Sequence, residues 1–181
     1  GISMPVVVLN ADADSFDAMA ANRLEPEIYS LRSLHEFAAA VERYGEQRYP
    51  IHVKLDTGMH RLGFVEEELP ALLDALARYG RTVRVASVFA HLCTSDDPAQ
   101  DDFTRLQIAR FDRMSSRIAE ALSYPVLRHT ANSAAIERFP EAQYDMCRLG
   151  LGLYGFGFEH NAALCPVSTL RTRIVQIKRL A

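Results

Sequence analysis

I-H-V-K-L-D, residues 51–56, discriminates between the two parallel architectures open to this chain. On a β-strand its apolar and polar side chains would occupy opposite faces, because successive side chains alternate: Ile51, Val53 and Leu55 against His52, Lys54 and Asp56. A strand of an open doubly wound sheet is covered by helices on both faces and is apolar throughout. A barrel strand has helices outside only, and its inner face can carry polar groups. The alternation therefore favours a TIM-type (β/α)8 barrel over the doubly wound sheet.

Short apolar runs alternate with amphipathic stretches along most of the chain. The strands that we predict lie at 5–9, 27–30, 51–56, 83–90, 126–129 and 144–148. The predicted helices are one that Ser33 caps, with Glu36 completing the capping box, and that Gly45 ends, and three more at 66–79, 103–122 and 133–139. This alternation is typical of parallel strands joined by crossover helices. A full barrel needs eight strands and about 250 residues, so we expect an incomplete α/β barrel of about six βα units from these 181 residues.

The pattern changes after Gly157. Residues 172–180 (T-R-I-V-Q-I-K-R-L) alternate polar and apolar side chains with a period of two, as does a strand that is exposed on one face. We therefore predict that residues 1–165 form part of a barrel domain and that residues 166–181 begin a C-terminal β-domain.

Composition narrows the possible functions. The chain is 49% hydrophobic and 24% charged with a net charge of -3, which is typical of a soluble globular protein. Its basic residues are scattered, which argues against nucleic-acid binding, and no apolar run approaches the roughly 20 residues of a membrane span. The three cysteines, Cys93, Cys147 and Cys165, have neither C-x-x-C spacing nor an even number, so we expect reduced thiols in a cytoplasmic protein.

Polar residues follow successive predicted strands at the carboxyl ends, where barrel enzymes place their active sites. They are Lys54, Asp56 and Arg61 after the third strand, His91 after the fourth, His129, Asn132 and Ser133 after the fifth, and Arg148 with the run R-L-G-L-G-L-Y-G (148–155) after the sixth. A buried Lys54 would have to be neutralised, paired or modified, because an isolated buried charge is costly. Ser133 at a helix start and the amides of Gly150 and Leu151 suit a phosphate group, which barrels often bind after strands seven and eight. The last predicted strand would then be the eighth of the barrel, with two strands before the first one seen here.

Each of these residues also has a structural interpretation. Asp56 can simply accept backbone hydrogen bonds in a turn, and Asn132 and Ser133 can cap the helix that follows. His91 can be an ordinary core histidine, and Arg148 can pair with any nearby carboxylate. The functional interpretation is favoured because the polar groups gather at the same end of several successive strands.

Four runs of this sequence resemble bacterial alanine racemases, in order and at matching spacing. They are H-V-K-L-D-T-G-M-H-R-L-G (52–63), F-A-H-L (89–92), H-T-A-N-S-A-A (129–135) and D-M-C-R-L-G-L-G-L-Y-G (145–155). The similarity extends from about residue 5 to residue 180. It implies an enzyme dependent on pyridoxal 5'-phosphate, built from an eight-stranded barrel and a β-domain and assembled as a homodimer. Such an enzyme interconverts L-alanine and D-alanine for peptidoglycan synthesis.

The resemblance also implies roles for the residues around the cofactor ring. Arg148 matches the arginine that donates to the pyridine nitrogen, and His129 matches the histidine that hydrogen-bonds this arginine. Arg61 matches the arginine beside the phenolic oxygen of the cofactor. Lys54 matches a lysine that is often carbamylated and then orients that arginine. His91 matches a residue near the cofactor and the base on the opposite face, so the catalytic candidates are Arg61, His91 and Arg148.

The remaining matches concern the phosphate. Ser133, with the backbone of Gly150 and Leu151, matches the phosphate-binding residues. Asn132 is also predicted to be a cofactor-binding residue. No metal ligand is implied. Two family features have no counterpart here: the cofactor lysine in a V-K-A-N-A-Y-G-H-G-like run, and the tyrosine base of the β-domain.

Lys54 does not replace the cofactor lysine, because its surroundings match the carbamylation site. We therefore expect these 181 residues alone to be inactive, as a central piece of the enzyme. The alternatives are a broader amino-acid racemase on the same barrel and a non-catalytic pyridoxal phosphate carrier. A decarboxylase is disfavoured, because those enzymes place an acidic residue where Arg148 stands.

Overall fold

The computed structural model describes residues 2–158 and 163–179, and within them five parallel strands form one sheet. The strands are β1 (Val7–Val8), β2 (Glu25–Ile28), β3 (Tyr49–Lys54), β4 (Val83–Phe89) and β5 (Leu127–His129). The strands follow one another in the sheet in the same order as in the chain. In a doubly wound sheet the strand order would instead reverse at a switch point. The sheet is an incomplete TIM-type barrel, which confirms the predicted α/β fold.

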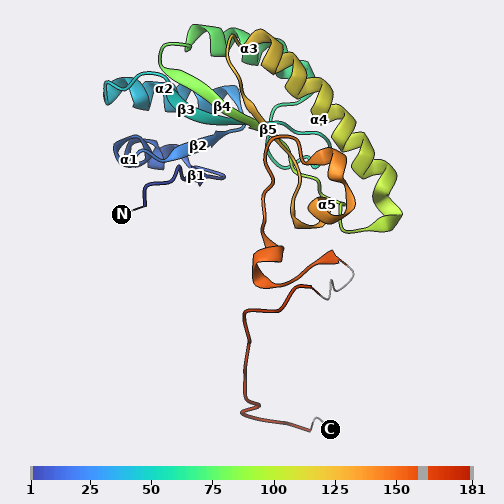
Figure 1. Cartoon of the computed structure of the whole chain (residues 1–181). Helices are drawn as coiled ribbons and strands as arrows, with labels where there is room; N and C mark the ends of the chain where they lie inside the picture. The colour runs from blue at the N-terminus through green and yellow to red at the C-terminus, as the bar shows by residue number, and fades with distance from the viewer. Residues whose placement is uncertain (1, 159–162, 180–181) are drawn as a thin grey trace.

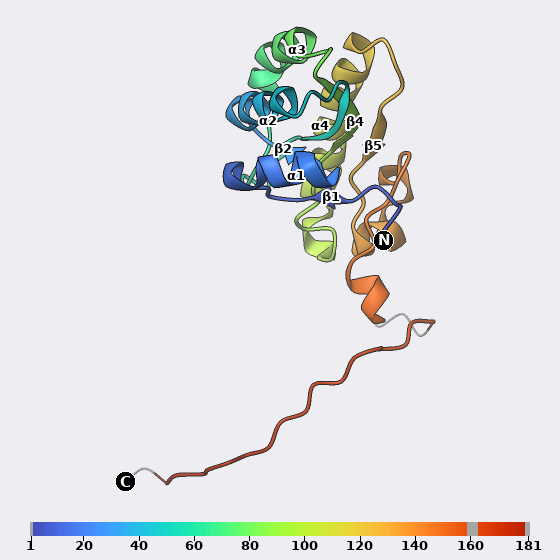
Figure 2. The same ribbon diagram turned by 90° about the vertical axis from the view of Figure 1, so that its left-hand side faces the viewer.

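The first four helices connect successive strands and cover the sheet from one side, and the fifth follows β5. They are α1 (Phe16–Asn22), α2 (Leu31–Arg43), α3 (Leu69–Arg78), α4 (Asp101–Ala121) and α5 (Ser133–Arg138). Figure 1 shows α2, α3 and α4 following one another along the outer face, and the view in Figure 2 places α1 beside α2. Between this layer and the sheet lies the main core, where Leu34, Phe37 and Val41 of α2 meet Ile51 and Val53 of β3, all with no exposed surface. No helix among the described residues has the length and apolar character needed to cross a membrane.

The start of α2 differs from the prediction. Ser30, not Ser33, is the N-cap: the Ser30 hydroxyl accepts from the backbone N–H of Ser33 at 3.1 Å, and the Ser33 hydroxyl accepts from that of Ser30 at 3.1 Å. Serine thus takes the place that glutamate has in the usual capping box. Glu36 instead pairs with Arg32 one turn earlier, at 2.8 Å.

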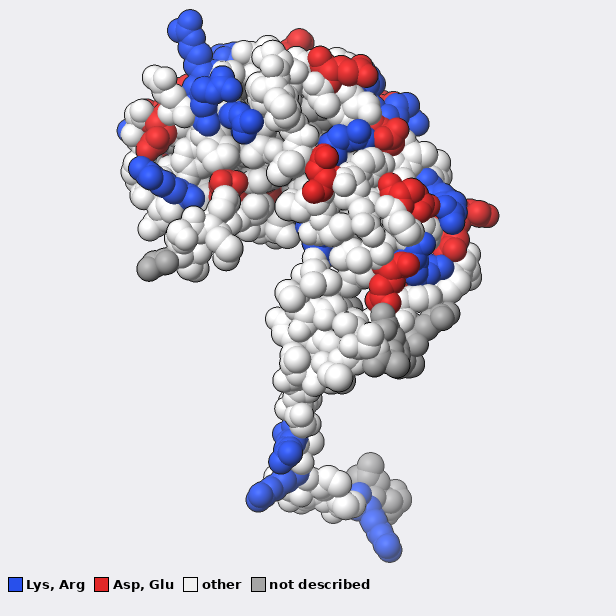
Figure 3. Space-filling model, in the orientation of Figure 1, with Lys and Arg blue, Asp and Glu red and all other residues white. Residues whose placement is uncertain are grey.

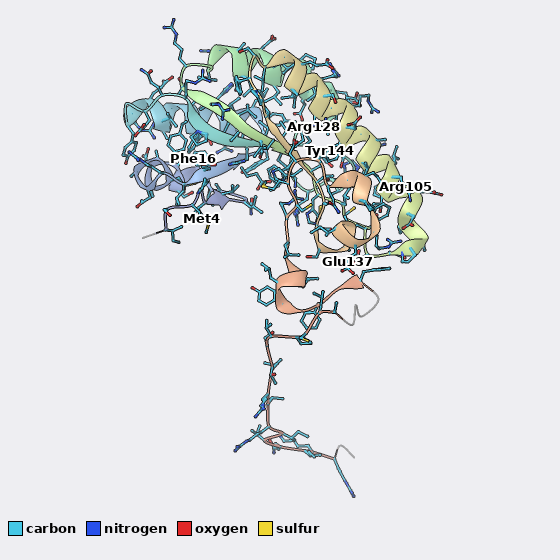
Figure 4. The ribbon with its side chains drawn as sticks, viewed as in Figure 1. Met4, Phe16, Arg105, Arg128, Glu137 and Tyr144 are labelled. Carbon is cyan, nitrogen blue, oxygen red and sulfur yellow. The ribbon has the colours of Figure 1, made fainter. Side chains whose placement is uncertain are left out.

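Residues 144–148 were predicted as a sixth strand, and this was wrong. The segment runs beside β5, with backbone hydrogen bonds from Asp145 to the Arg128 carbonyl and from Arg148 to the Ala131 carbonyl. These bonds are three residues apart, whereas a parallel ladder repeats every two. The backbone of Tyr144 has φ 49°, which is incompatible with an extended strand. Its ring instead lies 4.7 Å from the Arg128 guanidinium (Figure 4).

The predicted strand at 172–180 is also not formed over its described part, 172–179; residue 180 lies outside the described residues. The segment extends away from the barrel with Leu170, Ile174 and Val175 exposed (Figure 1). A strand needs a neighbour for its backbone N–H and C=O groups, and none of the described residues provides one.

Candidate active site

A cavity of about 820 Å³ lies at the carboxyl ends of the strands. Apart from His129, all predicted site residues line it: Lys54, Arg61, His91, Asn132, Ser133, Arg148, Gly150 and Leu151. The volume is within the range of small-ligand sites, about 300–1,000 Å³. The structure therefore brings together side chains that are separated by almost one hundred residues of sequence.

Arg148 is held at the floor of this cavity by backbone and imidazole acceptors. Its Nη1 donates to His129 Nδ1 at 2.7 Å and to the His129 carbonyl at 3.3 Å. Its Nη2 donates to the carbonyls of Ala90 at 2.6 Å and Thr130 at 3.2 Å. Burial lowers the pKa of Arg148 to about 10, so the group is still protonated at neutral pH. Of the five N–H groups of Arg148, only Nε–H has no acceptor among the described residues.

His129 lies behind Arg148. Burial, and then the charge of Arg148, lowers the pKa of His129 to about 3, so the ring is neutral. Because Nδ1 accepts from Arg148, the single ring proton is on Nε2, which lies 2.9 Å from Ser87 Oγ. The ring also stacks on Phe89, with centroids 5.0 Å apart.

Lys54 is buried without a hydrogen bond. The residue is only 6% exposed, and Lys54 Nζ lies 4.6 Å from the centre of the Phe89 ring. No described residue supplies an acceptor for this ammonium group. The pKa of Lys54 is lowered to about 8: burial is the main cause, Arg148 and Arg61 also lower it, and the carboxylate of Glu27 opposes the shift in part.

This shift makes stability depend on pH. Between pH 8 and 10.5 the unfolded chain binds a proton at Lys54 that the folded chain has already lost, so the free energy of unfolding rises with pH across this window. The rise attributable to Lys54 should total about 3 kcal/mol. Urea unfolding at several pH values measures this rise as the difference in the free energy of unfolding between wild type and Lys54→Met. At pH 7 the variant should be the more stable of the two proteins. Lys178→Met, at an exposed position, is the control, and parallel pH curves for wild type and Lys54→Met would contradict the expectation.

Ser133 and two glycines form a compact group of donors and acceptors. The Ser133 hydroxyl accepts from the backbone N–H of Gly150 at 2.9 Å and of Gly152 at 3.1 Å. A Cβ at Gly150 would lie 3.8 Å from that hydroxyl, so the absence of a side chain keeps the space in front of it open. Asn132 lies next to this group as the N-cap of α5: its Oδ1 accepts from the N–H of Ala135 and from Ser95 Oγ, which is the structural interpretation of this residue.

His91 and Arg61 complete the wall. Burial, together with the positive charges of Arg148, Lys54 and Arg61, lowers the pKa of His91 to about 4. The imidazole is therefore neutral and can accept a proton but has none to donate as an imidazolium. Arg61 is exposed at the rim. Asp56, by contrast, is a turn residue: its carboxylate accepts from the N–H groups of Gly58 and His60.

The sequence analysis missed part of the lining. Asn10 and Glu27, at the ends of β1 and β2, also line the cavity, and Glu27 is only 4% exposed. The same rule about carboxyl ends would have found them had it been applied to the first two strands. Phe89, at the end of β4, was taken only as part of a motif, although it packs against both Lys54 and Arg148.

Residues 1–157 match the family described as alanine racemase, N-terminal domain. The alanine racemase of Symbiobacterium thermophilum is 35% identical over 188 residues, covering 99% of this chain and 48% of the relative. That of Nitratidesulfovibrio vulgaris is 40% identical over 159 residues, covering 86% and 41%. The chain thus spans about half the length of the curated relatives that it matches.

Solved structures give the same result. The alanine racemase of a D-cycloserine-producing Streptomyces lavendulae superposes with a TM-score of 0.78 at 28% identity, covering 87% of this chain and 41% of that one. The fold is also shared with the enzyme from Streptomyces coelicolor, with a TM-score of 0.84 at 24% identity, covering 92% and 46%. The chain therefore belongs to the alanine racemase family and corresponds to its N-terminal domain.

Proposed function

We propose that this chain holds the ring and the phosphate of pyridoxal 5'-phosphate in an enzyme that interconverts L-alanine and D-alanine. The single observation that carries the proposal is Arg148: it is partly buried, charged and lines the cavity, and of its five N–H groups only Nε–H has no acceptor among the described residues. A donor that keeps its proton suits an unprotonated ring nitrogen. A related enzyme from Bartonella henselae was solved with covalently bound pyridoxal phosphate.

The other residues present fit this cofactor. The cavity lining carries three cationic side chains, Lys54, Arg61 and Arg148, against two carboxylates, Glu27 and Asp96. This excess of positive charge suits a ligand with a phosphate and a phenolic oxygen. The Ser133 hydroxyl accepts from the amides of Gly150 and Gly152, which leaves its own hydrogen to donate to a phosphate oxygen. A Cβ at Gly150 would enter the space beside them.

When bound, pyridoxal phosphate supplies the electron sink that stabilises the carbanion left after the α-proton of alanine is removed. The residues of this chain orient it and control protons. Arg148 holds its proton at the ring nitrogen, because its pKa of about 10 is well above neutral pH. His91, neutral under the same conditions, can accept a proton beside the cavity. Lys54, with a pKa of about 8, is partly unprotonated, as a lysine must be to become carbamylated and then orient Arg61.

The wider context of the enzyme is part of the proposal. Family resemblance supports a homodimer in the cytoplasm that supplies D-alanine for peptidoglycan. It also supports a division into a barrel part (1–165) and the start of a β-domain (166–181). No nucleic-acid or membrane partner is expected, since acidic and basic side chains are interspersed on the face seen in Figure 3. The 181 residues alone should not racemise alanine, because neither the cofactor lysine run nor the second base of the family is in this sequence.

Titration of the purified chain with pyridoxal phosphate, followed by fluorescence quenching, tests the proposal. Wild type should bind, and Ser133→Ala should bind roughly 10- to 100-fold more weakly, which corresponds to losing one hydrogen bond to a charged group. Gly150→Ala should also bind more weakly, because its Cβ enters the same space. Ser116→Ala is the control, because Ser116 lies in α4, which contributes no residue to the cavity lining. Equal affinities of all four proteins would refute the assignment of the phosphate site.

A further inference from the structure

A continuous line of hydrogen bonds crosses the interior of the barrel from Arg148 to Glu25. Arg148 Nη1 and His129 Nδ1 are 2.7 Å apart, His129 Nε2 and Ser87 Oγ 2.9 Å, Ser87 Oγ and His52 Nδ1 2.6 Å, and His52 Nε2 and Glu25 Oε2 2.7 Å. Four adjacent strands, β2 to β5, each contribute one member. His52 and Ser87 are direct partners in the register of β3 and β4.

The two ends of the line fix the direction of every bond in it. A guanidinium only donates, so His129 Nδ1 must accept and the ring proton is on Nε2. That proton is donated to Ser87 Oγ, whose own hydrogen is then donated to His52 Nδ1. The proton of His52 is left on Nε2, where it is donated to Glu25, a carboxylate that only accepts. Starting from Glu25 gives the same assignment, so all donors are used without conflict.

Burial agrees with this assignment. Ser87 is 0% exposed, His129 4% and His52 6%. Desolvation is the main cause that lowers the pKa of both histidines, so that each ring carries one proton, as the line requires. A protonated His52 or His129 would have two donors and would reverse one of the bonds.

We propose that Glu25, His52 and Ser87 are positioning residues, which hold the Arg148 guanidinium in place through the ring of His129. The proposal rests on the proposed function in that Arg148 is taken to face the cofactor ring. The line holds protons and does not carry them: moving one proton along each bond would leave a neutral guanidine and a neutral carboxyl, against the order of their proton affinities. The orientation of a donor at the cavity floor thus depends on a carboxylate three strands away.

Nuclear magnetic resonance of the chain without cofactor, with ¹⁵N-labelled histidine and arginine, tests this inference. In wild type, His52 and His129 should both carry the proton on Nε2, and the Nη protons of Arg148 should exchange slowly with water. Glu25→Ala should change the tautomer ratio of His52 about tenfold, the effect of one hydrogen bond, and should speed exchange at Arg148 by a similar factor. Glu25→Gln, whose Oε1 can still accept from His52, should restore both.

Ser87→Ala interrupts the line of hydrogen bonds at its central residue. It should speed exchange at Arg148, whereas His52 should keep its proton mainly on Nε2, because Glu25 still accepts from that atom. Adding Glu25→Ala to it should have no further effect on His129 or Arg148. Ser115→Ala removes another fully buried hydroxyl, one that accepts from Arg128, and should leave all these signals unchanged.

The proposal is overturned if Glu25→Ala alters His52 but leaves His129 and Arg148 as in wild type, or if Glu25→Gln fails to rescue. None of these measurements uses pyridoxal phosphate, so failure to bind the cofactor would count against the proposed function alone.

Discussion

Arg148→Met is expected to lower the free energy of unfolding by roughly 3 kcal/mol. The substitution removes the donor to His129 Nδ1 and to the carbonyls of His129, Ala90 and Thr130. The His129 carbonyl still accepts from the Ala90 N–H, but each of the other acceptors, left unsatisfied, costs about 1–3 kcal/mol. Against this, about 3 kcal/mol is recovered because a buried charge is removed, as the lowered pKa of Arg148 indicates. The orphaned acceptors outweigh the recovered desolvation.

The contrast with Lys54 makes the reasoning testable. Lys54 is a buried cation and Arg148 a partly buried one, and both have lowered pKa values, but among the described residues Lys54 donates no hydrogen bond. Lys54→Met should therefore stabilise the protein, whereas Arg148→Met should destabilise it. Urea unfolding at pH 7 measures both. Arg105→Met is the control, because the Arg105 side chain is 59% exposed and, within the described part of the chain, pairs only with Glu141 and the Phe139 ring. Its loss should therefore cost less than about 1 kcal/mol. The same sign for the two buried substitutions would show that hydrogen bonding does not separate them.

Gly63→Ala should cost about 4 kcal/mol, a loss at the upper end for single substitutions. Gly63 has φ 121°, and a Cβ there would lie 2.7 Å from the backbone N of Asp56 and the carbonyl C of Leu55. Both are backbone atoms, so relief requires the chain itself to move. That movement would break the hydrogen bonds by which Phe64 pairs with the end of β3, at Lys54 and Asp56.

Gly45→Ala is a matched control for this variant. Gly45 also has positive φ, 69°, but a Cβ there would meet nothing within 4 Å. Its substitution should cost about 1–2 kcal/mol, the price of a left-handed backbone alone. Unfolding in urea compares the two, and pyridoxal phosphate titration adds a second measurement, since Gly63→Ala also presses on Lys54 Cγ at 3.0 Å. Similar losses in both variants would mean that φ, and not the contact with the backbone, determines the cost.

The parts of this fold that were predictable are those with a local signal. Alternation in residues 51–56 led to the barrel, and the structure places His52 and Lys54 in its interior, 6% exposed each. The rule that barrel sites lie at the carboxyl ends of the strands identified the predicted site residues that line the cavity from the sequence alone. Both inferences depend only on side-chain period and strand direction.

The parts that were not predictable depend on conformation or on distant partners. Nothing in the composition of residues 144–148 marks Tyr144 as a residue with positive φ. The helix α1 has only seven residues, too few to display a helical period. The line of hydrogen bonds from Glu25 to Arg148 depends on the register of four strands, and this register cannot be read from the sequence. For the same reason Ser87 was not recognised: it lies in the middle of a strand, away from the carboxyl ends.

The strand order has a consequence for biogenesis. Because each strand pairs with the one synthesised just before it, every βα unit can dock as soon as it leaves the ribosome, without waiting for a remote segment. Short connections keep the entropy of loop closure small, and domains are generally built from the N-terminal end during synthesis. By the time residue 89 has emerged, the four paired strands β1 to β4 and the helices α1, α2 and α3 are available to enclose most of the apolar interior.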